Sequence, residues 1–357
     1  MFDFSNSSLW TTALAFLIAA AFVWAAGTRL ARYLDRITEK ADLGEAFVGL
    51  LLLGGITSLP EIATASSASW IGNAPLAINN VLGSAAINVV LLAIADALLG
   101  REALTSVVGQ PTPLLQGTLD ILLFTVIAMA IATGDVAVLG VGAWSMALVP
   151  LFLFALWLTS KYERRQVWVP SGTRGGETFG TAEEPGRDRK RAEQDGPSLR
   201  LLVVKTCVAA LVILVAGIVL ATTGDAIAQK TGVGAGLVGL VLVGFATSLP
   251  EISSIYEAVR LKRYSMVLGD IFGTNIFNVL LIFLADLLYA GPPVLAEAGT
   301  FELVATLLAT LVTCIYMIGL LERGDRTFLR MGYPSFAVII TFVAGLVVLF
   351  AISGGSG

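Results

Sequence analysis

The stretch Thr57-Ser58-Leu59-Pro60-Glu61-Ile62 occurs a second time, unchanged, as Thr247-Ser248-Leu249-Pro250-Glu251-Ile252, 190 residues further along the chain. Each copy lies within a long apolar segment. A carboxylate beside a proline inside a membrane helix is costly, and its occurrence at two matching positions is typical of a transport site built between two related halves. The rest of the sequence is interpreted outward from this block.

The composition is that of a membrane protein. Of the 357 residues, 56% are hydrophobic and only 13% are charged, whereas a soluble domain carries about a quarter charged residues. The apolar residues form runs of about 20, the length at which a helix crosses a bilayer. We therefore expect an all-α polytopic membrane protein. No nucleotide-binding motif is visible, and we expect neither a cofactor nor a nucleic-acid partner.

Ten transmembrane helices are predicted, with ends uncertain by a few residues. A hydrophilic segment over residues 161–200, with nine Lys/Arg and seven Asp/Glu, is expected to be a disordered linker. It separates a first five-helix half (1–160) from a second (201–352), and 353–357 are expected to be a flexible end. The predicted spans are 9–27, 45–70, 75–99, 113–133, 137–160, 201–223, 233–259, 265–290, 299–321 and 331–352.

The basic residues give this topology an orientation. If the loops are numbered along the chain, the odd-numbered loops hold 20 of the 22 Lys and Arg residues, and the even-numbered loops hold only Lys230. Positively charged loops stay in the cytoplasm. We therefore expect a protein of the cell (inner) membrane with both termini outside and the 161–200 loop in the cytoplasm.

The repeat keeps one register over residues 44–99 and 234–289. The offset of 190 pairs Gly83 with Gly273, and it also pairs Asp96 with Asp286. These two aspartates fall near the ends of their spans, and we expect them to be solvated at the membrane interface. Five spans per half is an odd number, so the second half enters the membrane in the opposite orientation. This predicts two inverted five-helix repeats related by a pseudo-twofold axis in the membrane plane. At a different offset, residues 117–120 resemble residues 299–302, which places Asp120 and Glu302 near an interface as well.

The prolines predict a break in each helix. Pro60 and Pro250 cannot donate a backbone hydrogen bond and clash with the carbonyl four residues earlier, and glycines such as Gly244 allow the helix to unwind. Carbonyl and hydroxyl oxygens near the breaks then become available as ligands. Glu61 and Glu251 follow at once, and an uncompensated carboxylate at this depth costs several kcal/mol, so a cation or proton should accompany it.

The next span in each half supplies a second polar row. In the first half the row is Asn80, Ser84 and Asn88, spaced so that they share a helix face. All candidate ligands are oxygen donors, which suits hard cations such as Ca²⁺ and disfavours soft metals. One Ca²⁺, two Na⁺ or two H⁺ would neutralise the two glutamates. The candidate site residues are Thr57, Ser58, Glu61, Ser84, Asn88, Thr247, Ser248, Glu251, Asp270, Thr274 and Asn278.

These residues resemble the cation/calcium antiporter superfamily, which contains the sodium/calcium exchangers and their prokaryotic relatives. The resemblance rests on the two Thr-Ser-Leu-Pro-Glu blocks and on Gly83-Ser84-Ala85-Ala86-Ile87-Asn88 and Gly273-Thr274-Asn275-Ile276-Phe277-Asn278. It implies that the glutamates are shared Ca²⁺/Na⁺ ligands and that the serines of the blocks line flanking Na⁺ sites. It also implies that the first and sixth spans slide over the core.

One departure from the family pattern concerns charge. The best-known exchangers carry Asp where this chain has Asn278, and relatives often carry Asn where it has Ala85. The loss of a charge favours electroneutral exchange of two monovalent ions for one Ca²⁺. Asp270, one turn before Thr274, could restore the charge, and the sequence leaves this open.

The favoured function is an antiporter that exchanges Ca²⁺ for Na⁺ by alternating access, not an enzyme. A Ca²⁺/H⁺ antiporter stays open as an alternative, because two glutamates suffice for proton coupling. A passive channel or an ion sensor fits less well, since the polar residues concentrate at mid-membrane and the flanking stretches are apolar. We expect a monomer in membrane lipid, because one chain contains both halves of the site.

Overall fold

The computed structural model describes residue 4 and residues 7–41, 58–99, 103–107, 111–163, 198–260, 264–324, 327–328 and 331–354. In these ranges, nine helices are long and apolar enough to cross a membrane, which confirms the all-α membrane architecture. The second predicted span, 45–70, begins outside the described residues. The exact count of ten therefore stays a prediction, as do the linker over 161–200 and the flexible end at 353–357.

The described residues of the first half form five long or medium helices, one short helix and one short hairpin. Helix α1 continues well beyond the predicted end of the first span at residue 27, because the polar stretch after it is rich in good helix formers and can leave the membrane as a helix. The elements are α1 (Leu9–Ala41), α4 (Leu59–Trp70), α5 (Ala74–Leu99), α6 (Leu104–Val107), α7 (Thr112–Thr133), β1 (Ala137–Val138), β2 (Val141–Gly142) and α8 (Ala143–Glu163).

The second half repeats this order. Ser198 begins it as an N-cap whose side chain accepts a hydrogen bond from the backbone N–H of Leu201, which satisfies one of the free donors at a helix start. The elements are α10 (Leu199–Thr231), α11 (Ala235–Leu237), the π-helix η2 (Val238–Val243), α12 (Gly244–Thr247), α13 (Leu249–Arg260), α14 (Tyr264–Leu288), α15 (Thr300–Glu322), β3 (Thr327–Phe328), β4 (Met331–Gly332) and α16 (Tyr333–Gly354).

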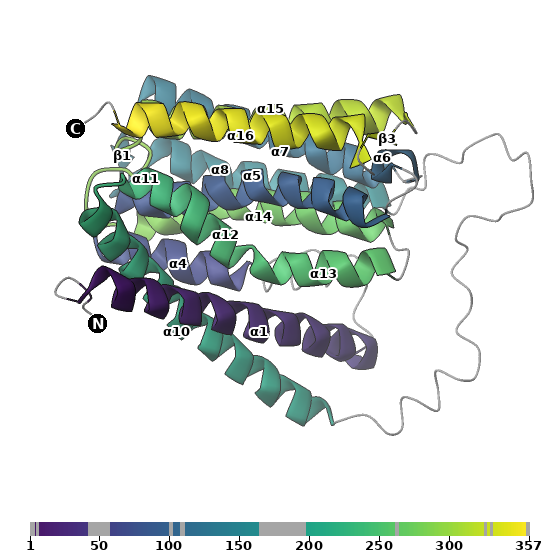
Figure 1. Cartoon of the computed structure of the whole chain (residues 1–357), viewed down its shortest axis with the longest axis horizontal. Coiled ribbons are helices and arrows are strands. Elements are labelled where there is room, and N and C mark those ends of the chain that lie inside the picture. The colour runs from purple at the N-terminus through teal and green to yellow at the C-terminus, as the bar shows by residue number, and fades with distance from the viewer. Residues whose placement is uncertain are drawn as a thin grey trace, which may run out of the picture.

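The two halves have opposite orientations in the bundle (Figure 1). The β1–β2 hairpin of the first half lies at one end, and the β3–β4 hairpin of the second half lies at the other. The hairpins obey the same offset of 190 as the sequence repeat, since Ala137 pairs with Gly142 and Thr327 pairs with Gly332. Helix α1 begins and α16 ends at the same end of the bundle (Figure 1).

Asp96 and Asp286 join the halves to each other. Asp96 accepts hydrogen bonds from the backbone N–H groups of Leu104 (2.5 Å) and Gly332 (2.6 Å). Asp286 does the same with Val294 and Gly142, both at 2.7 Å. Each aspartate thus holds the hairpin of the opposite half. Both are nearly fully buried, so the prediction that they are solvated at the interface is wrong: backbone donors replace water around these carboxylates.

Helices α1 and α10 form a pair at one side of the bundle, and each packs on the motif helix of the other half. Glycines allow the close approach. A Cβ at Gly27 of α1 would lie 2.6 Å from the Pro250 side chain, and one at Gly217 of α10 would lie 2.4 Å from Ala63. At one end of the pair, Lys230 donates to the Phe4 carbonyl and to two hydroxyls at the start of α1.

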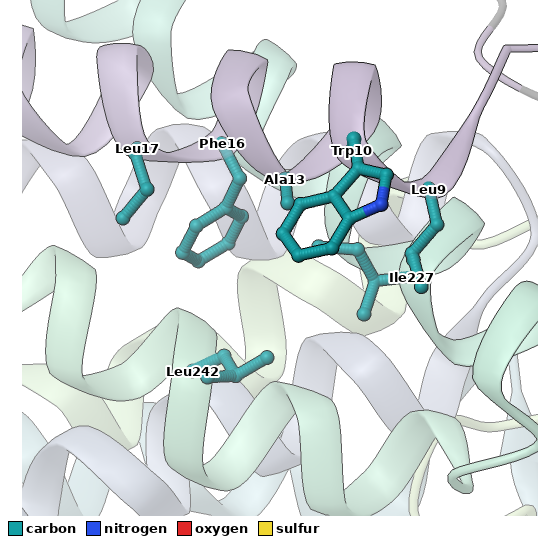
Figure 2. Close-up of a pocket in the computed structure, with 7 residues that line it drawn as sticks. All are labelled: Leu9, Trp10, Ala13, Phe16, Leu17, Ile227 and Leu242. Atoms are coloured by element: carbon teal, nitrogen blue, oxygen red, sulfur yellow. The ribbon is translucent and has the colours of Figure 1, made fainter.

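The outer face beside this pair has an apolar hollow of about 330 Å³ (Figure 2). In a membrane protein, such a hollow on the outer face is compatible with lipid tails. It lies away from the duplicated blocks. Its lining residues, from α1, α10 and η2, are Leu9, Trp10, Ala13, Phe16, Leu17, Ile227 and Leu242.

At the centre, α5 packs backbone to backbone against the segment that precedes the second block. A Cβ at Gly83 would lie 2.1 Å from the carbonyl oxygen of Leu240 in η2, and one at Gly244 would lie 3.0 Å from the backbone nitrogen of Ser84. Gly244 itself is helical, so the expectation that it unwinds the helix is wrong. Its role is close packing, which brings the second block next to Ser84.

Gly83→Ala should therefore destabilise the protein, because the added methyl group meets backbone that cannot rotate away. We expect a loss of about 1–3 kcal/mol, as for other overpacked cores, seen as a lower thermal unfolding temperature in detergent. Gly269→Ala on α14 is the matched control, since its Cβ would have only one neighbour, at 3.7 Å. Equal unfolding temperatures for the two variants would contradict the close approach.

Candidate ion-binding site

Each duplicated block forms the start of a short helix at the membrane interior. Ser58 (φ −80°, ψ 5°) and Ser248 (φ −82°, ψ 7°) have closely similar non-helical backbones, and α4 and α13 begin at the next residue. The prolines fall in the first turn, where a missing N–H costs nothing. The break before α13 falls at Ser248, and the π-helix η2 just before α12 is a second departure from α-helical geometry in the same span. Together they are a smaller distortion than the predicted unwinding.

The helix starts also position the two glutamates. Glu61 and Glu251 lie in the first turns of α4 and α13, where free backbone N–H groups and the helix dipole favour negative charge. Both side chains are fully buried. They lie close enough to interact electrostatically, although 190 residues separate them in the chain. The inverted repeat thus brings the two carboxylates to one site.

A hydrogen-bonded cluster surrounds Glu61. The Ser84 hydroxyl donates to Glu61 Oε1 at 3.3 Å and lies 3.0 Å from the Thr247 hydroxyl. Thr247 in turn lies 3.3 Å from Asn80 Oδ1. Four residues from α4, α5 and α12 therefore meet here, and Thr247 of the second half completes the surroundings of the first-half glutamate.

Seven of the predicted ligands are buried and have at least one polar atom without a hydrogen-bond partner. Their side chains are at most 1% exposed, yet at least one polar atom in each has no donor or acceptor. Buried polar atoms are normally paired, so unpaired ones need an explanation such as an ion. These residues are Ser58, Glu61, Asn88, Ser248, Glu251, Thr274 and Asn278.

Asp270 lies at the edge of this cluster. Its Oδ2 accepts a hydrogen bond from the Ser254 hydroxyl at 2.8 Å, and its charge acts on Glu251. In the part of the chain that the structure describes, however, no three acidic, thiol or imidazole side chains gather as a single metal site. Asp270 lies one turn before Thr274, about 6 Å along α14 toward its start. Asp270 thus neighbours Glu251 without forming a three-carboxylate metal site with it and Glu61 in the described residues.

Asn88 bridges two helices and keeps one unpaired oxygen. Its amide nitrogen donates to Asn275 Oδ1 at 3.0 Å and so bridges α5 and α14, while its own Oδ1 stays without a partner. Asn275 also donates to the Ala85 carbonyl at 3.2 Å. Sequence reasoning assigned no role to Asn275 or Ser254. The repeat register could have found Asn275, because its partner position is the unusual Ala85.

The structure thus brings only some of the predicted residues into direct contact. Glu61, Ser84 and Thr247 are in direct contact, the seven residues with unpaired atoms are buried, and Asp270 is peripheral. Thr57 lies outside the described residues, so its predicted role is not addressed.

An all-helical membrane bundle with two inverted halves and paired buried carboxylates defines a secondary cation transporter. The sequence profile described as sodium/calcium exchanger protein matches residues 11–162 and 201–352, one match in each half. The chain therefore belongs to the sodium/calcium exchanger family, whose members are transporters and not enzymes. This family membership confirms the resemblance inferred from the duplicated blocks.

Individual relatives agree with this assignment. The putative antiporter CaxA of Alkalimonas amylolytica is 26% identical over 309 residues, which cover 85% of this chain and 89% of CaxA. A crystal structure of the H⁺/Ca²⁺ exchanger CAX matches 96% of this chain and 85% of its own with a TM-score of 0.67 and 17% identity. The sodium-calcium exchanger NCX_Mj matches 96% and 99%, with a TM-score of 0.58 and 18% identity. At these identities the two structures establish the shared fold.

Ser84→Ala should weaken ion binding. The substitution removes a hydroxyl that donates to Glu61 Oε1, and a hydrogen bond to a charged group contributes about 1.5–3 kcal/mol. We expect the Ca²⁺ concentration for half-maximal uptake by proteoliposomes to rise about tenfold or more. Ser67→Ala is the matched control, because that buried hydroxyl bonds only within its own helix, to Ala63. A Ser84 variant indistinguishable from this control would contradict the proposed cluster.

Proposed function

We propose that this member of the exchanger family is an antiporter that moves Ca²⁺ in exchange for Na⁺ by alternating access. The observation that carries the proposal is the set of buried, unpaired oxygen atoms around two neighbouring glutamates. Within the two helices that carry the glutamates, the only basic residue is Arg260, the last residue of α13. Cations are therefore the natural counter-charge for the site.

The chemistry of the donors favours hard cations. Carboxylate, hydroxyl and amide oxygens suit Ca²⁺, which takes about 6–8 oxygen ligands in flexible geometry. In this proposal Glu61 and Glu251 bind Ca²⁺ or Na⁺ in turn. Ser58 and Ser248 contribute to flanking Na⁺ positions, and the remaining ligands are Thr57, Ser84, Asn88, Thr247, Thr274 and Asn278.

The packing of α1 and α10 supports a sliding mechanism. The two helices contact each other extensively, and each touches the glutamate-bearing helix of the opposite half through a glycine. Small residues at such interfaces permit close approach with little side-chain interlocking. We propose that the pair moves as one unit, tied by Lys230, and opens the site alternately to each side.

Glu61→Gln and Glu251→Gln should each abolish Ca²⁺ uptake driven by a Na⁺ gradient in proteoliposomes. Each substitution keeps the size of the side chain and removes the charge that balances the ion. Glu322→Gln, on the exposed end of α15, is the control and should transport normally. Uptake retained by both site variants would refute the site, and the absence of stimulation by either a Na⁺ or a pH gradient in the unaltered protein would refute antiport.

The two central glutamates predict electroneutral exchange, with two Na⁺ for each Ca²⁺. Asp270 is proposed to stay outside the ion-binding centre, in keeping with its bond to Ser254. Radioactive Ca²⁺ uptake should then be insensitive to an imposed membrane potential, whereas each net charge moved would respond by about 2.3 kcal/mol per 100 mV. Asp270→Asn should leave this insensitivity unchanged. A potential-dependent flux that the variant loses would place Asp270 among the ligands.

Proton coupling is the second candidate. Both carboxyl oxygens of Glu251 lack a hydrogen-bond donor, and a bound proton would supply one. The CAX structure, described as an H⁺/Ca²⁺ exchanger, has a similar fold. Uptake driven by a pH gradient with Na⁺ absent from both sides would favour this candidate over Na⁺ coupling.

We also propose that the protein acts as a monomer in the cell membrane, with both termini outside and the 161–200 loop in the cytoplasm. The charge distribution of the loops supports the orientation. Helix α1 begins and α16 ends at the same end of the bundle (Figure 1). This arrangement is compatible with both termini lying on one side of the membrane.

A further inference from the structure

Another buried carboxylate, Asp120, lies on α7 outside the proposed ion site. It is the ninth residue of α7, about 12 Å from the helix start, and its side chain is 0% exposed. This overturns the expectation that Asp120 lies near an interface. Glu302, its apparent counterpart in sequence, is only the third residue of α15. The two positions are not equivalent in the fold, and the offset of 190 pairs Asp120 with the neutral Thr310 instead.

Asp120 has few hydrogen-bond partners for so buried a carboxylate. Neither of its oxygens makes a hydrogen bond of good geometry, and its one neighbouring donor is the Asn275 amide. That amide donates one of its two hydrogens to the Ala85 carbonyl, which leaves the other to face Asp120. Glu302, by contrast, accepts from the Asn79 amide and from the Gly299 backbone, both at 2.8 Å. A carboxylate at this depth with one weak donor and no counter-charge is expensive.

A second unpaired acceptor lies one turn away. Gln116 is four residues before Asp120, so the two side chains share a face of α7. Gln116 is 2% exposed, and its Oε1 has no donor. Three oxygens without a good hydrogen bond therefore belong to two side chains on one buried helix face. A single hydrogen on the Asp120 carboxyl would give that group its uncharged form and offer a donor to the Gln116 carbonyl.

The titratable side chains on the helices packed against α7 provide no counter-charge. These helices are α8, α14 and α15. Asp270, Asp286 and Glu302 have the partners already described, the Lys161 ammonium lies over the Trp157 ring, and the Tyr316 ring packs on Phe272. The others are Tyr162, Glu163, Tyr264, Cys314 and Glu322. No charged group is identified as acting on Asp120.

We propose that Asp120 and Gln116 form a proton-binding site inside the membrane, separate from the central ion site, in which Asp120 carries the proton and donates it in a hydrogen bond to Gln116. A metal ion fits less well, because three oxygens from two side chains fall short of the shell that Na⁺ or Ca²⁺ requires. The proton site is present in only one half, so it breaks the symmetry of the repeat.

Infrared difference spectroscopy of the purified full chain in detergent tests this proposal at neutral pH. Subtraction of the Asp120→Asn spectrum from that of the unaltered protein should leave the carbonyl stretch of a protonated carboxyl group, which shifts to lower frequency in D₂O. Glu302→Gln is the control and should remove a carboxylate band instead. Loss of a carboxylate band in Asp120→Asn, or no difference at all, would overturn the proposal.

Two further measurements keep the test decisive. Asn has nearly the shape of a protonated Asp, so Asp120→Asn should unfold at the same temperature as the unaltered protein, whereas a marked loss of stability would indicate an ionised, paired carboxylate and count against the proton site. Gln116→Leu removes the acceptor and keeps Asp120. Its protonated-carboxyl band should persist at a higher frequency, and an unshifted band would refute the hydrogen bond to Gln116. Neither readout depends on transport.

Discussion

The structure depends on the cost of holding two carboxylates inside a membrane without basic partners. Glu61 and Glu251 are fully buried and lie close together, so their mutual repulsion adds to the cost of desolvation. Helix N-termini, the Ser84 hydroxyl and neutral oxygen atoms reduce this cost but do not remove the charge. A site of this kind is stable only with a bound cation or proton, and that requirement links the fold to ion exchange.

The close packing around the site follows from the same constraint. The carboxylates need neighbours with hydroxyl and amide groups from several helices, and those helices must approach closely to deliver them. Glycines make this possible: Gly83 and Gly244 bring α5 against the second block, and Gly27 and Gly217 bring α1 and α10 against the motif helices. The same smooth contacts are suited to the sliding proposed for α1 and α10.

Acidic residues in this protein have contrasting surroundings, and these determine their roles. Asp96 and Asp286 each accept two backbone hydrogen bonds and fasten the hairpin of the opposite half. Glu61 and Glu251 keep unpaired oxygens next to other proposed ligands. The oxygens of Asp120 are unpaired as well, but Asp120 lies outside that group of ligands. Residues of one chemical type thus serve as a structural tie, as an ion ligand or, in our proposal, as a proton carrier.

The sequence alone determined the helical membrane class, the register of the repeat and the two glutamates. The length of an apolar segment and an exact duplication can both be recognised in a sequence without knowing which residues are in contact. Even the hairpins follow the offset of 190. Only the tertiary structure decided the roles of Asp96, Asp120 and Asn275. Whether a buried polar group is paired depends on atoms from helices distant in sequence, and hydropathy records how apolar a segment is but not which donors meet its few polar side chains.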